Sequence, residues 1–245
     1  MANLVLDIGN TRTKMALFEG SALVEQKYVE SLQADDIESI CKQFCVKKCI
    51  ASVVGKEPDF ERILPDSLKS FFHRLTAKSK MPIKIDYDTP GTLGMDRVAA
   101  AAGAVGMSPG KPLLVIDAGS CITIDFVDEN AVYHGGAILP GLRMKFRSLH
   151  DYTQALPLVD ADLAAIGDCH VAGRNTEQSI LAGVATATLY EIRGFIEHYE
   201  KAYSGIKVFL TGGDSVFFAN KYIFPNFAVP ALVLWGLNNI LEMNV

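Results

Sequence analysis

The sequence predicts an α/β protein made of two similar halves, and three observations support this prediction. First, apolar residues alternate as in strands before and after a tight turn in each of the segments 4–18 and 113–127. Second, the two segments align without a gap when Asp7 is placed over Asp117, and their D-x-G triplets then coincide. Third, stretches with helical or buried-strand character follow each segment. A repeat offset by 110 residues, from Asp7 to Asp117, indicates a duplicated, strand-rich α/β unit.

The elements expected in the first half alternate between helix and strand. After the opening strand pair, we expect a helix over 34–44, a buried strand over 48–54, a helix over 57–72 and a strand over 81–87. The turn-rich residues 88–91 lead through 94–97 into an alanine-rich helix that ends near residue 105.

The second half begins after the clearest linker in the chain. Residues 107–112 (MSPGKP) have linker composition, so we expect domains over 1–110 and 111–245. Beyond the repeated strand pair, we expect a long helix over 176–202, a strand over 207–210 that runs into Thr211-Gly212-Gly213-Asp214, and a final helix over 230–243.

Composition and charge exclude several classes of protein. The chain has 245 residues, of which 49% are apolar and 21% charged, as in a globular protein and unlike a disordered one. The net charge of −5 argues against a nucleic-acid partner, which requires a concentrated positive face. No basic stretch precedes the short apolar run at the N-terminus, and the apolar segments near 97–107 and 226–237 are too short or too broken to span a bilayer. We therefore expect a cytoplasmic protein with no membrane partner.

Cysteine usage supports the same compartment. The five cysteines are Cys41, Cys45, Cys49, Cys121 and Cys169, and no pair forms C-x-x-C. This odd number fits a reducing cytosol better than a disulfide framework. The first three are spaced four apart and could share a helical face as metal ligands. Small packing residues are the favoured interpretation, because no histidine or fourth cysteine completes a ligand set.

Two D-x-G turns in duplicated contexts indicate a phosphate-binding site. Glycine lets the backbone approach a phosphate, whose oxygens then accept from the N–H groups of the turn. Asp7 and Asp117 can each hold Mg²⁺ directly or through its waters. Short donors and one cation follow the first turn: Asn10, Thr11, Thr13 and Lys14. A single D-x-G is more often simple turn chemistry, but two copies and the strand–GG–helix element at 207–216 reverse that preference. The P-loop and G-x-G-x-x-G patterns are absent.

Several motifs together resemble one kinase family. Asp7-x-Gly9-Asn10-Thr11-x-x-Lys14 resembles the first phosphate motif of the acetate and sugar kinase/Hsp70/actin superfamily. With the further motifs in their order and spacing, residues 4–214 resemble a type III pantothenate kinase. Those motifs are Gly94-x-Asp96-Arg97, Asp117-x-Gly119-Ser120, Gly135-Gly136-x-Ile138-x-Pro140-Gly141-Leu142, Asn175-Thr176 and the segment 153–157 (TQALP).

The resemblance implies a fold and a reaction. The fold is α/β, with duplicated ribonuclease H-like halves as in actin-like ATPases, each a mixed sheet flanked by helices. Such kinases transfer the γ-phosphoryl group of ATP to the primary hydroxyl of pantothenate, which gives 4′-phosphopantothenate in the first step of coenzyme A biosynthesis. Mg²⁺ accompanies ATP, and a monovalent cation, K⁺ or NH₄⁺, is expected. A homodimer with the substrate pocket near its interface is implied, and the small and apolar residues of 179–192 could pack in the core or against another chain.

The resemblance also implies roles for individual residues. The implied ATP contacts are Asp7, Ile8, Gly9, Asn10, Thr11, Arg12, Thr13, Lys14 and Ser120. The implied pantothenate contacts are Tyr87, Gly94, Met95, Asp96, Arg97 and Thr176. Asp117 is expected to help bind the monovalent cation. Asp96 is expected to be the general base, and Arg97 suits the carboxylate of pantothenate because a guanidinium can grip it with two hydrogen bonds.

Each of four residues also has a structural interpretation. Asp96 could simply cap the alanine-rich helix, and Thr176 could cap the long helix that begins there. Arg97 could be a solvated surface charge. Tyr87 could be a half-buried strand residue with its hydroxyl in water.

Two functional alternatives stay open from sequence. One is another small-molecule kinase or phosphohydrolase of the same superfamily, and the other is a non-catalytic binding member. Loss of Asp7, Lys14 or Asp96 would favour the latter, and all three are present. The second phosphate motif departs from the family's D-x-G-T-A at Ser120-Cys121. Serine keeps the hydroxyl, so we expect activity to persist.

Overall fold

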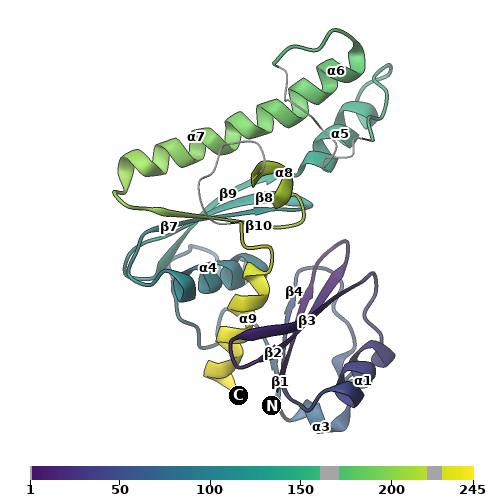
Figure 1. Ribbon diagram of the computed structural model, residues 1–245, viewed down its shortest axis with the longest axis vertical. Helices are drawn as coiled ribbons and strands as arrows, with labels where there is room; N and C mark the ends of the chain where they lie inside the picture. The colour runs from purple at the N-terminus through teal and green to yellow at the C-terminus, as the bar shows by residue number, and fades with distance from the viewer. Residues whose placement is uncertain (1, 161–170, 220–227) are drawn as a thin grey trace. The chain divides into compact units, whose positions relative to one another are not determined.

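The computed structural model describes residues 2–160, 171–219 and 228–245. Its strands form two five-stranded sheets, with order β3-β2-β1-β4-β5 in one and β10-β7-β8-β9-β6 in the other (Figure 1). Two compact units are distinguished. The first comprises Met1–Gly110, Val127–Gly135 and Ala231–Val245, and the second comprises Lys111–Phe126 and Gly136–Pro230. The predicted domains 1–110 and 111–245 stay a prediction.

The first sheet is mixed. Its strands are β1 (Ala2–Ile8), β2 (Thr13–Glu19), β3 (Ala22–Val29), β4 (Val46–Val53) and β5 (Phe72–Arg74). β1 pairs antiparallel with β2 and parallel with β4. The predicted strand–turn–strand at 4–18 and the strand at 48–54 are confirmed, because their apolar residues fill buried positions of a central ladder.

The helices of the first unit include one clear correction. Its helical elements are α1 (Ala34–Gln43), α2 (Phe60–Ile63), α3 (Asp66–Lys69), the 3₁₀ turn η1 (Pro90–Thr92), α4 (Met95–Met107) and α9 (Leu232–Asn244). The prediction of one helix over 57–72 is wrong. Pro65 separates α2 from α3, because its ring lacks the N–H that a continuous helix requires. Asp59 caps α2 by accepting a hydrogen bond from the Arg62 N–H.

The strand predicted over 81–87 is also shorter than expected. Only Lys84 and Ile85 form β6, and they pair parallel with Val132 and Tyr133 of β9 (Val132–Pro140). Asp86 extends this ladder by one hydrogen bond, from its N–H to the Tyr133 carbonyl. Beyond it, the turn toward η1 leads the chain away from the sheet.

The two faces of the first sheet carry different helices. One face contributes Leu4, Leu6 and Ala51 to a core that includes side chains of α1 and α3. On the other face, Asn3 of β1 donates hydrogen bonds to Asn238 and Glu242 of α9. The hydrogen bond from Asn3 to Glu242 holds the pKa of that carboxyl below its ordinary value, together with the nearby Lys48. Helices therefore cover both faces of the central strands.

Helices α4 and α9 cross at two glycines. A Cβ built on Gly103 of α4 would lie 2.5 Å from the Leu232 carbonyl oxygen, and one on Gly236 of α9 would collide with the Ala99 carbonyl. The helix backbones are thus in direct contact. The alanine-rich composition of α4 follows, because only small side chains fit between helices this close.

The second unit repeats the strand order of the first. Its strands are β7 (Leu113–Ala118), β8 (Cys121–Val127), most of β9, and β10 (Lys207–Thr211). The order β9-β8-β7-β10 reproduces β3-β2-β1-β4, and β7 pairs parallel with β10 as β1 does with β4. The predicted fold class, duplicated ribonuclease H-like halves, is confirmed.

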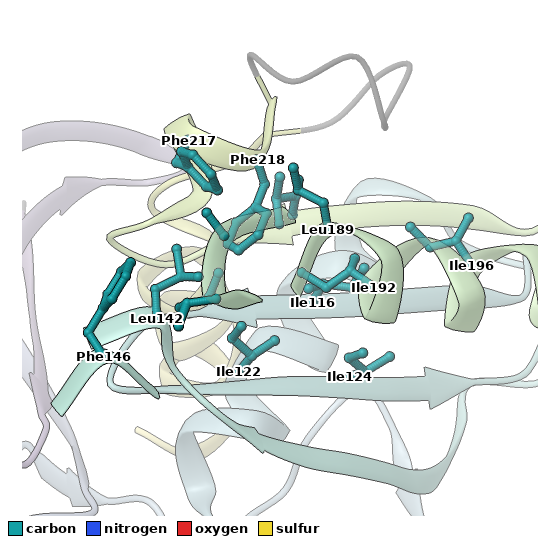
Figure 2. Close-up of a cluster of buried hydrophobic side chains, with 14 of the residues drawn as sticks. Ile116, Ile122, Ile124, Leu142, Phe146, Leu189, Ile192, Ile196, Phe217 and Phe218 are labelled. Atoms are coloured by element: carbon teal, nitrogen blue, oxygen red, sulfur yellow. The ribbon is translucent and has the colours of Figure 1, made fainter. Parts of the chain in front are cut away.

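Helices of the second unit cover its sheet. They are α5 (Leu142–Asp151), α6 (Thr176–Leu181), the π-helical turn η2 (Ala182–Thr186), α7 (Ala187–Ala202) and α8 (Ser215–Ala219). The helix predicted over 176–202 corresponds to α6, η2 and α7 in succession. Figure 2 shows Leu189, Ile192 and Ile196 of α7 facing the strand residues Ile116, Ile122 and Ile124. This i, i+3, i+7 spacing is the buried stripe of an amphipathic helix.

The cysteine spacing does not correspond to one helical face. Cys41 lies on α1, Cys45 follows that helix, and Cys49 is fully buried in β4. Burial raises the pKa of the Cys49 thiol, which disfavours the thiolate that a metal would need. Cys121 begins β8 and is exposed, and Cys169 lies outside the described residues.

Candidate active site

The first D-x-G turn closes the hairpin between β1 and β2. The Gly9 N–H donates a hydrogen bond to the Arg12 carbonyl at 3.2 Å, so the loop folds back on itself. Asp7 and Lys14 are cross-strand partners at its base, and Lys14 Nζ lies 3.3 Å from Asp7 Oδ2. Asp7 is 7% exposed. The loop therefore presents a carboxylate and an ammonium group together at the end of a buried strand.

The other predicted ATP residues differ in exposure. Asn10, Thr11 and Arg12 are exposed at the tip of the loop, and the Arg12 guanidinium lies 4.8 Å above the Tyr28 ring. Ile8 and Thr13 are buried. A ligand above this loop can reach the three tip residues directly.

The end of β4 supports this loop. The loop was predicted from the sequence, but this contact was not. The N–H groups of Val54 and Gly55 both donate to the Ile8 carbonyl, at 2.9 and 3.3 Å. A Cβ on Gly55 would lie 2.5 Å from the Gly9 carbonyl oxygen. The available signal was a glycine immediately after the predicted buried strand, where a second backbone approaches closely.

The motif 94–97 lies at the start of α4. Gly94 is the N-cap, and the Asp96 carboxylate accepts a hydrogen bond from the Arg97 N–H at 2.9 Å. A Cβ on Gly94 would lie 2.6 Å from Asp96 Oδ1, so the glycine leaves room for this carboxylate. Asp96 lies in the first turn, where the helix dipole favours a negative charge, and the interpretation of Asp96 as the N-cap is wrong.

Arg97 is not a surface charge. Its exposed fraction is only 7%, which overturns that structural interpretation. The side chain of Met95 is also buried, so a ligand would reach Met95 through its backbone. A buried guanidinium needs anionic or carbonyl partners around it.

Tyr87 packs against a glycine of β9. A Cβ on Gly135 would lie 2.9 Å from the Tyr87 ring, and Gly135 has φ +84°. The Tyr87 and Tyr133 ring centroids are 6.4 Å apart. Tyr87 is half-buried, as its structural interpretation expected, and the glycine determines where its ring lies.

His134 links two carboxylates beside Tyr87. Its Nδ1 lies 3.3 Å from Asp86 Oδ2 and its Nε2 lies 3.1 Å from Asp128 Oδ2. Burial raises the pKa of Asp128, but hydrogen bonds from the Val132 N–H, His134 and Asn130 outweigh burial and lower it overall. The hairpin end that carries Gly135 is thus tied to the segment that carries Tyr87.

The second D-x-G turn lies between β7 and β8 in the second unit. The Gly119 N–H donates to the Cys121 carbonyl at 2.9 Å, and the Gly141 N–H donates to the Ser120 carbonyl at 3.2 Å. Asp117 is partly buried, and Ser120 is exposed on the turn.

The glycine pair after β10 packs against this turn. Gly212 has φ +93°, and a Cβ there would collide with Asp117 Oδ1 and the Ala118 carbonyl. The Asp214 N–H donates to the same Ala118 carbonyl at 2.9 Å. The segment Thr211–Asp214 therefore encloses Asp117, as the strand–GG–helix pattern indicated.

Thr176 is exposed in the first turn of α6. The N-cap is Asn175, whose side chain accepts a hydrogen bond from the Gln178 N–H at 2.8 Å. The interpretation of Thr176 as the cap is therefore wrong, and its hydroxyl is available to a ligand.

The described residues contain neither a cluster that could hold a metal ion nor a membrane-spanning helix. No group of three or more His, Cys, Asp or Glu side chains in residues 2–160, 171–219 and 228–245 could hold a metal ion. Within the same ranges, no helix has the length and apolarity to cross a membrane.

Two sheets of matching strand order, each with a D-x-G turn after its first strand, define a protein with duplicated ribonuclease H-like halves. The family model for type III pantothenate kinase matches residues 3–198. The chain belongs to that family.

Curated relatives support this assignment, and solved structures are similar to the chain in fold. A type III pantothenate kinase of Bacteroides fragilis is 42% identical over 99% of this chain and 98% of its own length. One from Cytophaga hutchinsonii is 38% identical over 99% of this chain and 100% of its own. A Campylobacter jejuni structure, described as a candidate Baf family transcriptional activator, has a TM-score of 0.59 at 23% identity over 98% of this chain and 97% of its own. A glucokinase from Balamuthia mandrillaris has a TM-score of 0.54 at 10% identity, with 98% and 93% covered. The two structures show likeness of fold alone.

Proposed function

We propose that this chain transfers the γ-phosphoryl group of ATP to the primary hydroxyl of pantothenate, which gives 4′-phosphopantothenate in the first step of coenzyme A biosynthesis. The observation that carries the proposal is 42% identity over nearly the whole chain to a relative named type III pantothenate kinase. Every side chain that the reaction needs from the motif residues is present.

The ATP phosphates are proposed to lie against the β1–β2 loop. Backbone N–H groups of the loop and the Lys14 ammonium would neutralise phosphate oxygens. Asp7 would hold Mg²⁺ through its waters, since this ion prefers oxygen ligands and keeps part of its hydration shell. Residues 7–14 and Ser120 would form the ATP contacts, and Asp117 would help to bind K⁺ or NH₄⁺.

Pantothenate is proposed to bind near the start of α4. Arg97 would pair with its carboxylate, while Tyr87, Gly94, Met95 and Thr176 would provide further contacts. The buried position of Arg97 supports this role, because desolvated charge pairs are strong and specific.

Asp96 is proposed to be the general base. The pantothenate hydroxyl oxygen attacks the γ-phosphorus, the bond to the ADP oxygen breaks, and the hydroxyl proton passes to Asp96. A carboxylate with an ordinary pKa of about 3.9 is a weak base for an alcohol. In a loose transition state it need only orient the hydroxyl and accept the proton late.

The Asp96→Asn substitution tests this role. Asparagine keeps an acceptor for the Arg97 N–H, so the first turn of α4 should remain intact. We expect kcat to fall at least about a hundredfold, the usual contribution of a general base. ATP affinity by calorimetry should stay unchanged. Full activity of the variant would remove Asp96 as the base.

Substrate choice is tested by a coupled assay across pantothenate, common sugars and acetate, with and without K⁺. Phosphorylation of pantothenate alone, stimulated by K⁺, is the expected result. Turnover of a sugar would favour another kinase of the superfamily, and bare ATP hydrolysis would contradict both. We further propose that the enzyme works as a homodimer in the cytoplasm, where ATP is available.

A further inference from the structure

Ser52 of β4 carries an unusual buried hydroxyl. The residue is 0% exposed, and its Oγ has no hydrogen-bond partner within the described part of the chain. A buried hydroxyl that has lost water without gaining a partner destabilises the folded state. Because native proteins pair nearly all such groups, each exception calls for a specific reason.

The position of Ser52 in the sheet suggests that reason. Ser52 and Asp7 are direct register partners in the parallel ladder between β4 and β1. Their neighbours Leu6, Ile8 and Ala51 belong to the core on the opposite face of the sheet. Since strand side chains alternate between faces, the side chains of Ser52 and Asp7 lie side by side on the same face.

Asp7 has capacity for a further donor. Its ion pair with Lys14 is 3.3 Å long, whereas charge-assisted hydrogen bonds are usually about 2.7–2.9 Å. An ionised carboxylate can accept about four hydrogen bonds. Lys14 is also the cation that incoming phosphates would attract.

We propose that Ser52 is a positioning residue for Asp7: its hydroxyl donates to the Asp7 carboxylate when ATP phosphates draw Lys14 away. This inference rests on the proposed function, because it takes residues 7–14 as the phosphate loop. A serine hydroxyl turns toward a new acceptor by rotation about one bond. The strand that carries it is held in place, since Val54 and Gly55 bond to the Ile8 carbonyl next to Asp7.

The decisive variant is Ser52→Ala. The ligand-free melting temperature should stay unchanged or rise slightly, because the lost hydroxyl had no partner. The Kd for ATP in Mg²⁺ buffer, measured by calorimetry, should rise about tenfold, as expected for a hydrogen bond to a charged group. KM for pantothenate should not change.

Two further variants separate positioning from stability. Ser215 is a matched control, because it is also buried but its hydroxyl donates to the Gly212 carbonyl at 2.7 Å. Ser215→Ala should therefore lower the melting temperature. Ser52→Thr keeps the donor but adds a methyl group where no space is free, so it should melt earlier yet keep its ATP affinity.

The outcomes are distinguishable. If the wild type binds no ATP, the proposed function fails. If the wild type binds ATP and Ser52→Ala binds it equally well, the positioning role is overturned while the proposed function stands. A lower ligand-free melting temperature for Ser52→Ala would also overturn it, because the hydroxyl would then have a partner before ATP arrives.

Discussion

At the scale of single residues, the geometry of the motifs depends on the absence of side chains as much as on charge. Gly94 leaves room for the Asp96 carboxylate, Gly55 lets the end of β4 meet the β1–β2 loop, and Gly212 lets the segment after β10 enclose Asp117. In each case a Cβ would displace a charged group or the backbone beside it. The charged residues can therefore be read from the sequence, but the glycines that position them depend on tertiary contacts.

Gly135→Ala tests this dependence at the tyrosine. The new Cβ would lie 2.9 Å from the Tyr87 ring, which must then move. We expect KM for pantothenate to rise on the order of tenfold, because small misplacements of binding groups are costly. ATP affinity should be unchanged, and steady-state kinetics with each substrate varied measures both.

Gly110→Ala is the matched control for that substitution. Gly110 also has a positive φ, +70°, but a Cβ there meets nothing within 4 Å. Both variants should lose about 1–2 kcal/mol from the left-handed backbone, while only Gly135→Ala changes KM. Equal KM values for the two variants would contradict the proposed role of Tyr87.

At the scale of elements, the α4–α9 crossing packs the last helix of the chain against the alanine-rich helix of the first unit. Gly236→Ala would place a methyl group against the Ala99 carbonyl, so the helices must separate. We expect a loss of about 3 kcal/mol in the free energy of unfolding, typical of severe overpacking. Urea denaturation followed by circular dichroism measures it.

The same substitution on an open helix should have the opposite sign. Gly194 lies inside α7, and a Cβ there meets nothing within 4 Å. Gly194→Ala should stabilise the protein by about 0.5–1 kcal/mol through helix propensity. Equal effects at both positions would show that the α4–α9 contact is not close.

At the scale of the whole molecule, the duplication was readable because each first strand and its turn are local features. The repeated segments 4–18 and 113–127 form the neighbouring strands β1–β2 and β7–β8, which occupy the same places in the two strand orders. One prediction failed although the signal was local: Pro65 divides the stretch 57–72, which otherwise has helical spacing. Another failed because a partner decides the outcome, since β6 is limited to the two residues that pair with β9. The roles of Asp96 and Thr176 stay predictions. The N-cap positions belong to Gly94 and Asn175, while Asp96 accepts a hydrogen bond from the Arg97 N–H in the first turn of α4.

Oligomeric state is the last property predicted at this scale. Tyr190 on α7 and Val171 are 55% and 73% exposed and line a cavity of about 480 Å³ together with small residues such as Gly183. Large exposed apolar side chains beside a concave, small-residue surface are typical of an interface.

We expect light scattering to give twice the 26.6 kDa of one chain, and Tyr190→Glu to halve that mass. Val24→Glu, an equally drastic change on β3 in the other unit, should leave the mass unchanged. A wild type that runs as a monomer would contradict the dimer, whereas a dimeric Tyr190→Glu would place its interface elsewhere.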